Sequence, residues 1–343
     1  MNPSLLLARS QITKLVRRYF DDQDFVEFHT PRLVGLPGQE PYLEPLWSEI
    51  EEQNGTKHRG ALITSPEYAM KKLLAAGFEK IYDLGPCFRN SEPWDGTHDV
   101  EFLMIEWYRR DAALEALFQD TEGLVKAVAK QWFSTEAGAA GIQDRAWMEG
   151  AFRRLTVAEA MKYYANIDLD TVLDRKEALA SLVKERGMQV GEADTWDDLF
   201  FKIFLTEVEP HLGWSGKGSD RTIQPTFLYN YPASMAALAR KHPTDPRYAL
   251  RTEFYFGDLE LANGFAELSN PVEQRARFVE EQDLRKSLGK EIWPIDERFI
   301  ECLPKMGDAA GIAFGVDRLV MALTGVKSIS GLMPVPIRER FLG

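Results

Sequence analysis

Cysteine is scarce in this 343-residue sequence, which has only Cys87 and Cys302. Two cysteines cannot form a disulfide framework or a thiolate zinc site, and they fit a reducing compartment. No apolar run approaches the roughly 20 residues that a membrane-spanning helix needs. The N-terminus also lacks the basic, apolar and small-residue order of a signal peptide. We therefore expect a cytoplasmic protein.

Positively charged residues are also fewer than negatively charged ones. The sequence has 41 Lys and Arg and 53 Asp and Glu, which gives a net charge of −12. This acidity argues against binding nucleic acid through net charge, although a local basic patch could still hold a phosphate chain. Several motifs are missing as well: the glycine patterns of Rossmann and P-loop sites, the HExxH zinc spacing and the serine nucleophile elbow. The sequence therefore offers no candidate for covalent catalysis.

What the sequence does contain is a set of strands that follow one another in hairpins. Ile81–Arg89 and Phe102–Arg109 are predicted to pair around the polar loop Asn90–Asp99. Ala249–Phe256 and Leu259–Leu268 are predicted to pair around the two-residue turn Gly257-Asp258. The other expected elements are strands at Phe25–Phe28, Ala61–Thr64 and Thr226–Tyr229, helices at Leu5–Phe20, Glu67–Ala76, Pro271–Leu288 and Val316–Leu323, a loop at Pro37–Thr56 and a turn at Gly311–Gly315.

This order of elements indicates the fold class. Consecutive hairpins with helices grouped between them favour an α+β fold, with a central antiparallel sheet flanked by helices, over an alternating βαβ fold. No repeat, flexible linker or shift in composition marks a domain boundary. We therefore predict a single domain over residues 1–343, with a helical insertion at about 112–220.

The first segment that could carry chemistry is the hairpin CFRNSEPWDGTHDVEFLMIEWYRR, Cys87–Arg110. Strand alternation places Phe102, Glu106 and Tyr108 on one face, and Arg89 enters from the neighbouring strand. An unpaired buried carboxylate is costly, so Glu106 on an otherwise apolar strand suggests a function. The alternative is a half-exposed strand with a surface glutamate and a salt-bridged arginine.

The second segment is RTEFYFGDLELANGFAELSN, Arg251–Asn270. A two-residue turn would place Glu253 opposite Ala262 and diagonal to Glu260, roughly 7 Å away. Two carboxylates at that spacing could share Mg²⁺ ions bound to a polyphosphate. Strict alternation puts three further side chains on the opposite face, and they join the first two only if the strand bulges near Ala262–Gly264. Those three residues are Asn263, Phe265 and Glu267. The alternative is an exposed acidic hairpin.

The third segment is GIAFGVDRLVMALTG, Gly311–Gly325. Its small residues allow close approach of the backbone, and the following helix projects Arg318 from its first turn. A planar guanidinium there could stack on a base or hold a phosphate. The alternative is a packed helix whose arginine bridges a nearby carboxylate.

In this order the segments resemble the three signature motifs of class II aminoacyl-tRNA synthetases, and in detail the lysyl branch. Thr30-Pro31 is similar to motif 1, FRN followed by HDVEFLMIEWY to motif 2, and GVDRLVMALTG to motif 3. SPEYAMKKLL, PTFLYNYPAS and ELANGFAEL resemble further lysyl-type segments, so the likeness covers nearly the whole chain. It implies the class II catalytic fold and the use of ATP and Mg²⁺.

The resemblance also implies roles for the matching residues. Arg89 and Arg318 would be catalytic, and Glu253 and Glu260 would hold Mg²⁺. The residues expected to bind ATP are Arg89, Ser91, Glu92, His98, Phe102, Glu253, Glu260, Gly315 and Arg318. The residues expected to bind the amino acid are Glu67, Glu106, Tyr108, Asn263, Phe265, Glu267 and Ala313.

The sequence departs from the family pattern in the motif 2 loop. Ser91 stands in place of the usual glutamate, with Glu92 after it, and Asp99-Val100 replaces Asn-Pro. The basic residue that this loop usually offers to the γ-phosphate is absent. Lys57, Arg59 or a flanking arginine could substitute for it.

The chain begins at motif 1, so we expect no β-barrel anticodon-binding domain. Free-standing catalytic domains of this kind resemble the ligases that attach (R)-β-lysine to a lysine of elongation factor P. The sequence Glu106-Trp107-Tyr108, the run Pro232–Ser234, and Ala313 in place of the glycine usual in lysyl-tRNA synthetases favour that branch. The expected substrate is lysine or (R)-β-lysine, and the expected acceptor is elongation factor P.

Two other functions stay open. One is a truncated lysyl-tRNA synthetase-like enzyme that acts on tRNA or a small amine. The other is a catalytically inactive paralogue that binds lysine or nucleotide as a regulator. Because motif 1 forms a two-fold interface in class II enzymes, we also expect a homodimer.

Overall fold

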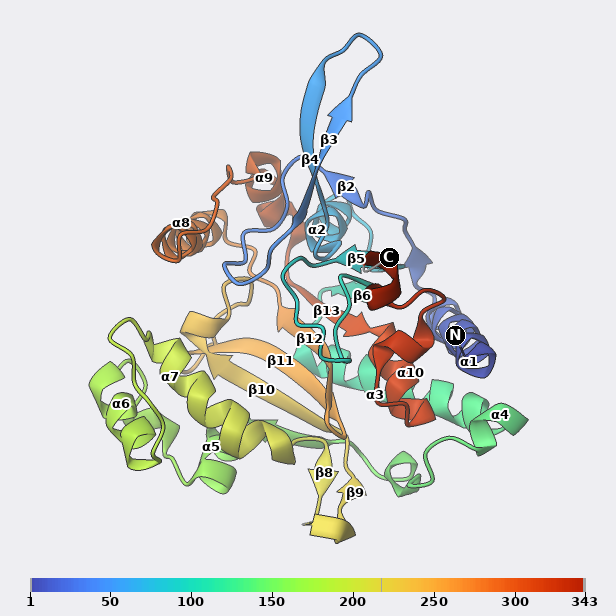
Figure 1. Cartoon of the computed structure of the whole chain (residues 1–343). Coiled ribbons are helices and arrows are strands. Elements are labelled where there is room, and N and C mark those ends of the chain that lie inside the picture. The colour runs from blue at the N-terminus through green and yellow to red at the C-terminus, as the bar shows by residue number, and fades with distance from the viewer. Residues whose placement is uncertain (1, 217, 342–343) are drawn as a thin grey trace. The chain divides into compact units, whose positions relative to one another are not determined.

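The computed structural model describes residues 2–216 and 218–341. It divides into two compact units, and each is described by itself. Unit 1 comprises Met1–Gln143 and Ala266–Gly343, and unit 2 comprises Asp144–Phe265 (Figure 1). The single domain with an insertion at about 112–220 stays a prediction. Among the described residues, no helix combines the length and the apolar character needed to cross a membrane.

Both units contain helices and strands. The helices are α1 (Pro3–Asp22), α2 (Glu67–Ala75), α3 (Leu114–Phe133), α4 (Glu136–Ala139), α5 (Val157–Ala165), α6 (Lys176–Glu185), α7 (Trp196–Ile203), α8 (Pro271–Ser287), α9 (Glu297–Met306), α10 (Val316–Thr324) and α11 (Ile337–Phe341). The strands are β1 (Val26–Glu27), β2 (Leu33–Val34), β3 (Leu46–Glu51), β4 (Lys57–Leu62), β5 (Lys80–Phe88), β6 (Glu101–Arg110), β7 (Arg153–Thr156), β8 (Trp214–Ser215), β9 (Thr222–Ile223), β10 (Thr226–Pro232), β11 (Tyr248–Phe256), β12 (Leu259–Ala266) and β13 (Ala309–Gly315).

Unit 1 is built on the strand order β1-β5-β6-β13. Strands β5 and β6 form the predicted antiparallel hairpin, and β13 pairs antiparallel with the other edge of β6. Only the short β1 runs parallel to its neighbour β5. An antiparallel arrangement is therefore confirmed for the strands that carry the first candidate segment.

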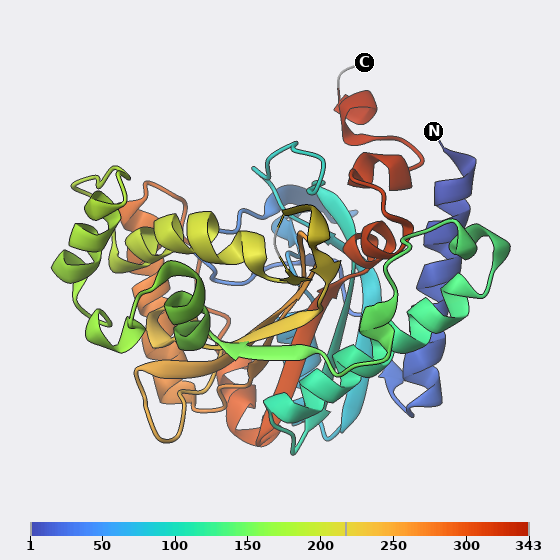
Figure 2. The ribbon, with the colours of Figure 1, turned by 90° about the horizontal axis from the view of Figure 1, so that it is seen from below.

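Helices cover both faces of these strands. On one face, Phe20 of α1 packs against Trp107 of β6 with ring centroids 5.0 Å apart. The Tyr19 hydroxyl donates a hydrogen bond to the backbone oxygen of Asp120 in α3, 3.1 Å away, and Figure 2 shows α1 and α3 crossing beside each other. On the other face, the side chain of Ser65, just before α2, contacts Glu106. The odd-numbered face of β6 is thus core, and the face with Glu106 belongs to a polar site.

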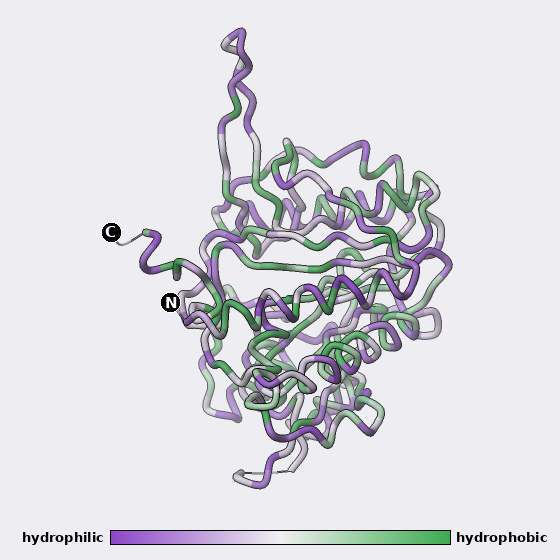
Figure 3. Tube along the Cα trace, turned by 90° about the vertical axis from the view of Figure 1, so that its right-hand side faces the viewer, coloured by the Kyte–Doolittle hydropathy of each residue, from purple (hydrophilic) through white to green (hydrophobic). Residues whose placement is uncertain are grey.

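The predicted loop Pro37–Thr56 is wrong in part, because it contains β3. Strands β3 and β4 pair from Leu46 opposite Leu62 to Glu51 opposite Lys57. They form a hairpin whose outer end is hydrophilic (Figure 3). Most side chains of β3 are exposed. The sequence therefore lacks the apolar alternation that identifies a half-buried strand.

The predicted turn Gly311–Gly315 is also wrong. These residues belong to β13, which pairs with β6 from Ala309 to Gly315. Its small side chains are buried between neighbouring elements. Glycines in this segment therefore mark close packing rather than a turn.

Unit 2 carries the strand order β12-β11-β10-β7. The pairs β11–β12 and β10–β11 are antiparallel, whereas β7 runs parallel to β10. Helices α5, α6 and α7 contribute Met161, Leu179 and Phe200 to a buried core with Tyr255. Residues 112–220 are mostly helical as predicted, but they also include β7 and β8.

The hairpin β11–β12 contains a bulge, as the convergence of its polar residues requires. Tyr255 pairs with Glu260, but Phe254 pairs with Ala262, so Leu261 is the extra residue. The bulge lies one residue before the predicted range, and Glu253 consequently faces Asn263 instead of Ala262. Because directly paired residues share a face, Glu253, Glu260 and Asn263 lie on one side of the hairpin.

Candidate active site

Glu106 and Tyr108 form the centre of the site in unit 1. The Tyr108 hydroxyl donates to Glu106 Oε1 at 2.5 Å, and the Ser65 hydroxyl donates to Glu106 Oε2 at 2.6 Å. Glu106 is only 2% exposed. The alternative of a half-exposed surface glutamate is therefore wrong.

Helix α2 brings a second carboxylate and a cation to this centre. Glu67 lies in its first turn, and the Glu67 backbone N–H donates to Ser65 Oγ at 3.1 Å. One helical turn later, the fully buried Lys71 forms ion pairs with Glu67 and, at 2.6 Å, with Glu267. Burial by itself would lower the pKa of Lys71, but Glu267 and Glu67 outweigh it and raise the pKa, so the ammonium stays charged.

Glu267 completes the group from the chain just after β12. Its Oε2 lies 2.6 Å from Lys71 Nζ, and apart from this ion pair neither carboxylate oxygen has a hydrogen-bond partner among the described residues, although the side chain is fully buried. Gly311 of β13 lies beside it: a Cβ at that position would be 2.7 Å from Glu267 Oε1 and 2.1 Å from Tyr108 Cε1. The glycine is therefore required for both side chains to reach the site.

The negative charge in this group is incompletely neutralised. Burial, and then the neighbouring Glu67, raises the pKa of Glu106 to about 8. Burial is the largest cause that raises the pKa of Glu267 to about 8. Lys71 opposes this rise, and Glu67 adds to it. Three buried carboxylates therefore share one ammonium, and the site favours a further cation.

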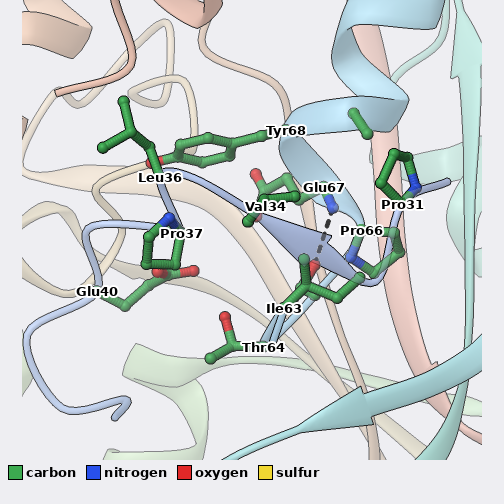
Figure 4. A pocket seen from close by; sticks show the side chains of 13 residues that line it. Pro31, Val34, Leu36, Pro37, Glu40, Ile63, Thr64, Pro66, Glu67 and Tyr68 are labelled. Atoms are coloured by element: carbon green, nitrogen blue, oxygen red, sulfur yellow. Dashed lines mark hydrogen bonds between the residues drawn. The ribbon is translucent and has the colours of Figure 1, made fainter. Parts of the chain in front are cut away.

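A pocket opens beside these residues. Its lining includes Ser65 and Glu67, together with Glu40 and an apolar wall that contains Leu36 and Tyr68 (Figure 4). Burial and Glu67 raise the pKa of Glu40, while Arg89 and Lys71 oppose this. A small molecule that enters the pocket would thus meet acidic groups within an apolar frame.

The residues predicted to bind ATP in unit 1 lie around the ends of β5 and β6. The guanidinium carbon of Arg89 lies 5.1 Å from the centre of the Phe102 ring, and Arg89 Nε is buried without a hydrogen-bond partner among the described residues. Arg318 Nη2 lies 3.2 Å from His98 Nε2. Gly315, the last residue of β13 and the N-cap of α10, pairs with Met104 of β6. The fold therefore brings motif 2 and motif 3 together, as predicted.

The motif 2 loop holds the other two residues predicted to bind ATP. Ser91 has a φ of 59°, in the left-handed region, and its backbone N–H donates to Asn90 Oδ1 at 2.9 Å. A Glu92 carboxylate oxygen lies 3.9 Å from His98 Nε2. Both residues are therefore in the loop that approaches Arg318.

Lys57 and Arg59, which we named as substitutes for the missing basic residue, have other partners. Lys57 pairs with Glu49 at 2.6 Å, and Arg59 pairs with Glu291 through a contact of 2.8 Å. The Arg59 guanidinium also stacks 3.6 Å from the centre of the Trp47 ring. Their role at the γ-phosphate stays a prediction.

In unit 2, Glu253 lies in a network of hydrogen bonds. Arg251 donates to its Oε1 at 2.6 Å, and the phenols of Tyr231 and Tyr255 donate to Oε2. Burial and Glu253, with a smaller effect of Glu260, raise the pKa of Tyr255, so Glu260 is close to this network.

Glu253 and Glu260 are the carboxylates that this face of unit 2 offers to a magnesium ion whose other ligands come from phosphate. Glu253 Oε2 is saturated by two phenols, but Oε1 keeps one lone pair. No group of three or more His, Cys, Asp or Glu side chains in the described part of the chain could hold a metal by itself. Mg²⁺ usually needs only one or two carboxylates when phosphate oxygens supply further ligands.

Two other predicted residues belong to the same face of unit 2. Asn263 Oδ1 accepts a hydrogen bond from Arg251 Nε at 3.1 Å. Phe265 pairs directly with Arg251. In unit 1, Ala313 pairs directly with Glu106.

Sequence reasoning missed three residues of the site: Ser65, Lys71 and Glu40. The spacing of Glu67 and Lys71, four residues apart on a helix, is a signal for an ion pair. That pair is usually at the surface, so the spacing alone could not show that Lys71 is buried. Ser65 gives a weaker signal as a polar residue just before a helix.

Comparison with known proteins places the chain among synthetases. Residues 2–339 match the family model described as tRNA synthetases class II (D, K and N). The elongation factor P–(R)-β-lysine ligase of Proteus mirabilis is 34% identical over 97% of this chain and 94% of that protein. The ligase of the same name from Photorhabdus laumondii is 35% identical over 97% and 95%. The lysine–tRNA ligase of Halalkalibacterium halodurans is 33% identical over 98% of this chain but 64% of that protein.

Proposed function

The chain belongs to the class II tRNA synthetases of the D, K and N type, and on this premise we propose that it is an ATP-dependent, AMP-forming ligase. It would activate lysine or (R)-β-lysine as an aminoacyl-adenylate and transfer the acyl group to a lysine of elongation factor P. Two relatives whose names describe this ligation align with nearly the whole chain, which supports the proposal.

The observation that carries the proposal is the surplus of buried carboxylates in unit 1. Glu67, Glu106 and Glu267 share the single ammonium of Lys71. A substrate with an extra amine would supply the missing positive charge, and buried ion pairs are stable only when each charge is compensated. An amino acid with a neutral side chain brings only its own amine. Two of the three acids would then still compete for the ammonium of Lys71.

We assign the substrate contacts from this charge pattern and from the family likeness. Glu106, Tyr108 and Glu267 would receive the distal ammonium, because Glu267 Oε1 still lacks a partner among the described residues. Glu67 would receive the amine near the carboxylate. Asn263 would support the carboxylate itself.

The reaction would proceed by positioning and charge neutralisation. A carboxylate oxygen of the amino acid attacks the α-phosphorus of ATP in line, and pyrophosphate leaves. Arg89 would bridge the carboxylate and the α-phosphate, while Phe102 and Arg318 would hold adenine between them. Mg²⁺, which Glu253 and Glu260 would hold, supplies charge neutralisation at the phosphates. The acceptor amine then attacks the acyl carbon, AMP leaves and the amine loses a proton.

Pyrophosphate exchange tests the first half of the reaction. The purified chain would be given ATP, labelled pyrophosphate and a panel of lysine isomers, with leucine as the neutral control. Exchange that depends on a lysine isomer is expected. No exchange with any isomer would contradict the proposal and leave a role in binding lysine or nucleotide.

A second candidate is transfer to tRNA, which the lysine–tRNA ligase relatives favour. Purified elongation factor P and tRNA would be incubated separately with the enzyme, ATP and the best isomer. Intact mass measurement would detect the protein adduct, and acid gels would detect charged tRNA. An adduct on elongation factor P alone is expected, and charged tRNA alone would favour the second candidate.

We also propose a homodimer. Helix α1 buries Ile12, Val16 and Phe20, and Leu7 on the same helix is 63% exposed. Val26 in the adjacent edge strand β1 is 49% exposed. Sedimentation at micromolar concentration should give twice the chain mass, and a monomer would contradict the proposal.

A further inference from the structure

The C-terminal segment of unit 1, residues 328–341, lies against the motif 2 loop. It consists of the 3₁₀ helix η7 (Ile329–Leu332) and α11. The Ile329 backbone N–H donates to the Gly96 oxygen at 2.7 Å. Further along, the Phe341 ring stacks on Trp94 with centroids 6.4 Å apart. The loop is therefore held at its tip by a segment that is more than 200 residues away in sequence.

An ion pair anchors the base of the same loop. Arg340 Nη2 contacts both carboxylate oxygens of Asp99, with Oδ2 at 2.5 Å, across 241 positions of sequence. Asp99 is 2% exposed, and its Oδ1 also accepts from the Glu101 backbone N–H at 3.2 Å. Arg340 reaches Glu101 as well, at 3.4 Å.

The energetic consequence of this pair follows from its burial. Removing Arg340 would leave the Asp99 carboxylate buried without a counter-charge, which is strongly unfavourable. The loop would then move until Asp99 reached water.

Asp99 lies between groups that we assign to ATP. The preceding residue, His98, places Nε2 beside Arg318 Nη2 at 3.2 Å. Three residues after Asp99, Phe102 lies under the Arg89 guanidinium. A shift of Asp99 would therefore displace both the His98 contact and the start of β6.

We propose that Arg340 is a positioning residue for the ATP half-reaction: through Asp99, the C-terminal segment holds the motif 2 loop in the conformation that binds ATP. This inference rests on the proposed function. It assigns the tail a role in nucleotide binding, while the acidic pocket for the amino acid stays independent of it.

The test compares Arg340→Ala and Asp99→Asn with the wild type in pyrophosphate exchange. The KM for ATP should rise about tenfold in both variants, while the KM for lysine stays within twofold. The KM for ATP of the double variant should be no higher than that of the more impaired single variant, because the two substitutions remove the same interaction. Arg340→Lys keeps the charge and should recover part of the ATP affinity.

Arg275→Ala is the matched control, because it breaks an arginine–carboxylate pair in the same unit whose side chains are 44% and 58% exposed. Its KM for ATP should not change. Amide hydrogen exchange adds a readout without substrate: residues 92–98 should exchange faster in Arg340→Ala, with no change in β5.

An unchanged KM for ATP in Arg340→Ala, or an equal loss for ATP and lysine, would overturn the inference. If the wild type itself shows no exchange, the proposed function fails, but the role of the tail is still decided by calorimetry with ATP. In that case, Arg340→Ala should bind ATP about tenfold more weakly, and equal affinity would overturn the inference.

Discussion

Ala313 lies directly opposite Glu106 across the antiparallel pair of β13 and β6. Side chains in such pairs lie on the same face with Cβ atoms about 4.5–5.5 Å apart. The methyl group of Ala313 therefore borders the carboxylate that we assign to the distal ammonium. On that assignment, this methyl group would form part of the wall of the lysine pocket.

Ala313→Gly should change which lysine isomer is preferred. Removal of one methyl group from a pocket wall changes discrimination by about 1–3 kcal/mol. We expect the ratio of kcat/KM values for (R)-β-lysine and L-α-lysine in pyrophosphate exchange to move about tenfold toward the α-isomer. The KM for ATP serves as the internal control, and an unchanged isomer ratio would show that this wall does not select.

Arg89→Ala should lower kcat/KM for pyrophosphate exchange by at least about 100-fold, as the loss of one charge-stabilising group typically does. Its buried Nε lacks a protein partner among the described residues, so it is available to a ligand. Arg89→Lys keeps the charge but loses the planar fork and should stay at least about tenfold impaired. Near-normal exchange in the alanine variant would remove Arg89 from the mechanism.

Lysine binding should release a proton near pH 7. Glu106 and Glu267 have pKa values raised to about 8, so each is partly protonated in the empty site at neutral pH. An incoming ammonium favours the ionised carboxylate, and the affinity for lysine should therefore rise between pH 6 and pH 8. Calorimetry in two buffers of different ionisation enthalpy measures the release directly. Glu106→Gln should reduce it, and equal heats in both buffers would contradict the assignment.

The same carboxyls should make the empty protein less stable as pH rises. Their folded pKa values exceed the ordinary value of 4.5, so between about pH 4.5 and pH 8 the folded state holds more protons than the unfolded state. Their contribution to the free energy of unfolding must then fall across this range. Urea unfolding at pH 5.5, 7 and 8.5 measures the slope, which should be shallower in Glu106→Gln/Glu267→Gln.

Gly311→Ala should weaken lysine binding at least about tenfold and destabilise the fold by about 1–3 kcal/mol, the usual effect of overpacking. The new Cβ would lie 2.1 Å from Tyr108 Cε1 and 2.7 Å from Glu267 Oε1, so one of them must move. Gly35→Ala is the control, since no heavy atom lies within 4 Å of its added Cβ. Equal lysine affinities in the two variants would refute the packing argument.

Much of the fold follows from local pattern. The helix Leu5–Phe20 and the hairpin β5–β6 are confirmed because their apolar spacing and turn residues agree with their surroundings. The prediction of a turn at β13 is wrong because it depends on Gly311 and Gly315, and glycine is common in turns. Only the packing around β13 shows that Gly311 makes room for Tyr108 and Glu267.

The site is predictable to the extent that it depends on residue type and alternation. Glu106 and Tyr108 share a face as expected, and a bulge in β12 brings Asn263 to the face of Glu253. Burial of Lys71 and the pairing of Asp99 with Arg340 depend on tertiary contacts, and the second of these spans 241 positions. No local pattern carries that information.

The extra residue Leu261 has an evolutionary consequence for the β11–β12 hairpin. If Leu261 paired with Phe254 instead of being left out of the pairing, Asn263 and Phe265 would each move one position along β11 and turn to the far side, and both would lose their relation to Arg251. The strand should therefore tolerate substitutions at many positions, but a further residue inserted between Leu261 and Asn263 would shift the pairing of Asn263 and Phe265. Insertions and deletions among natural variants should accumulate elsewhere, in connecting segments that no catalytic side chain depends on.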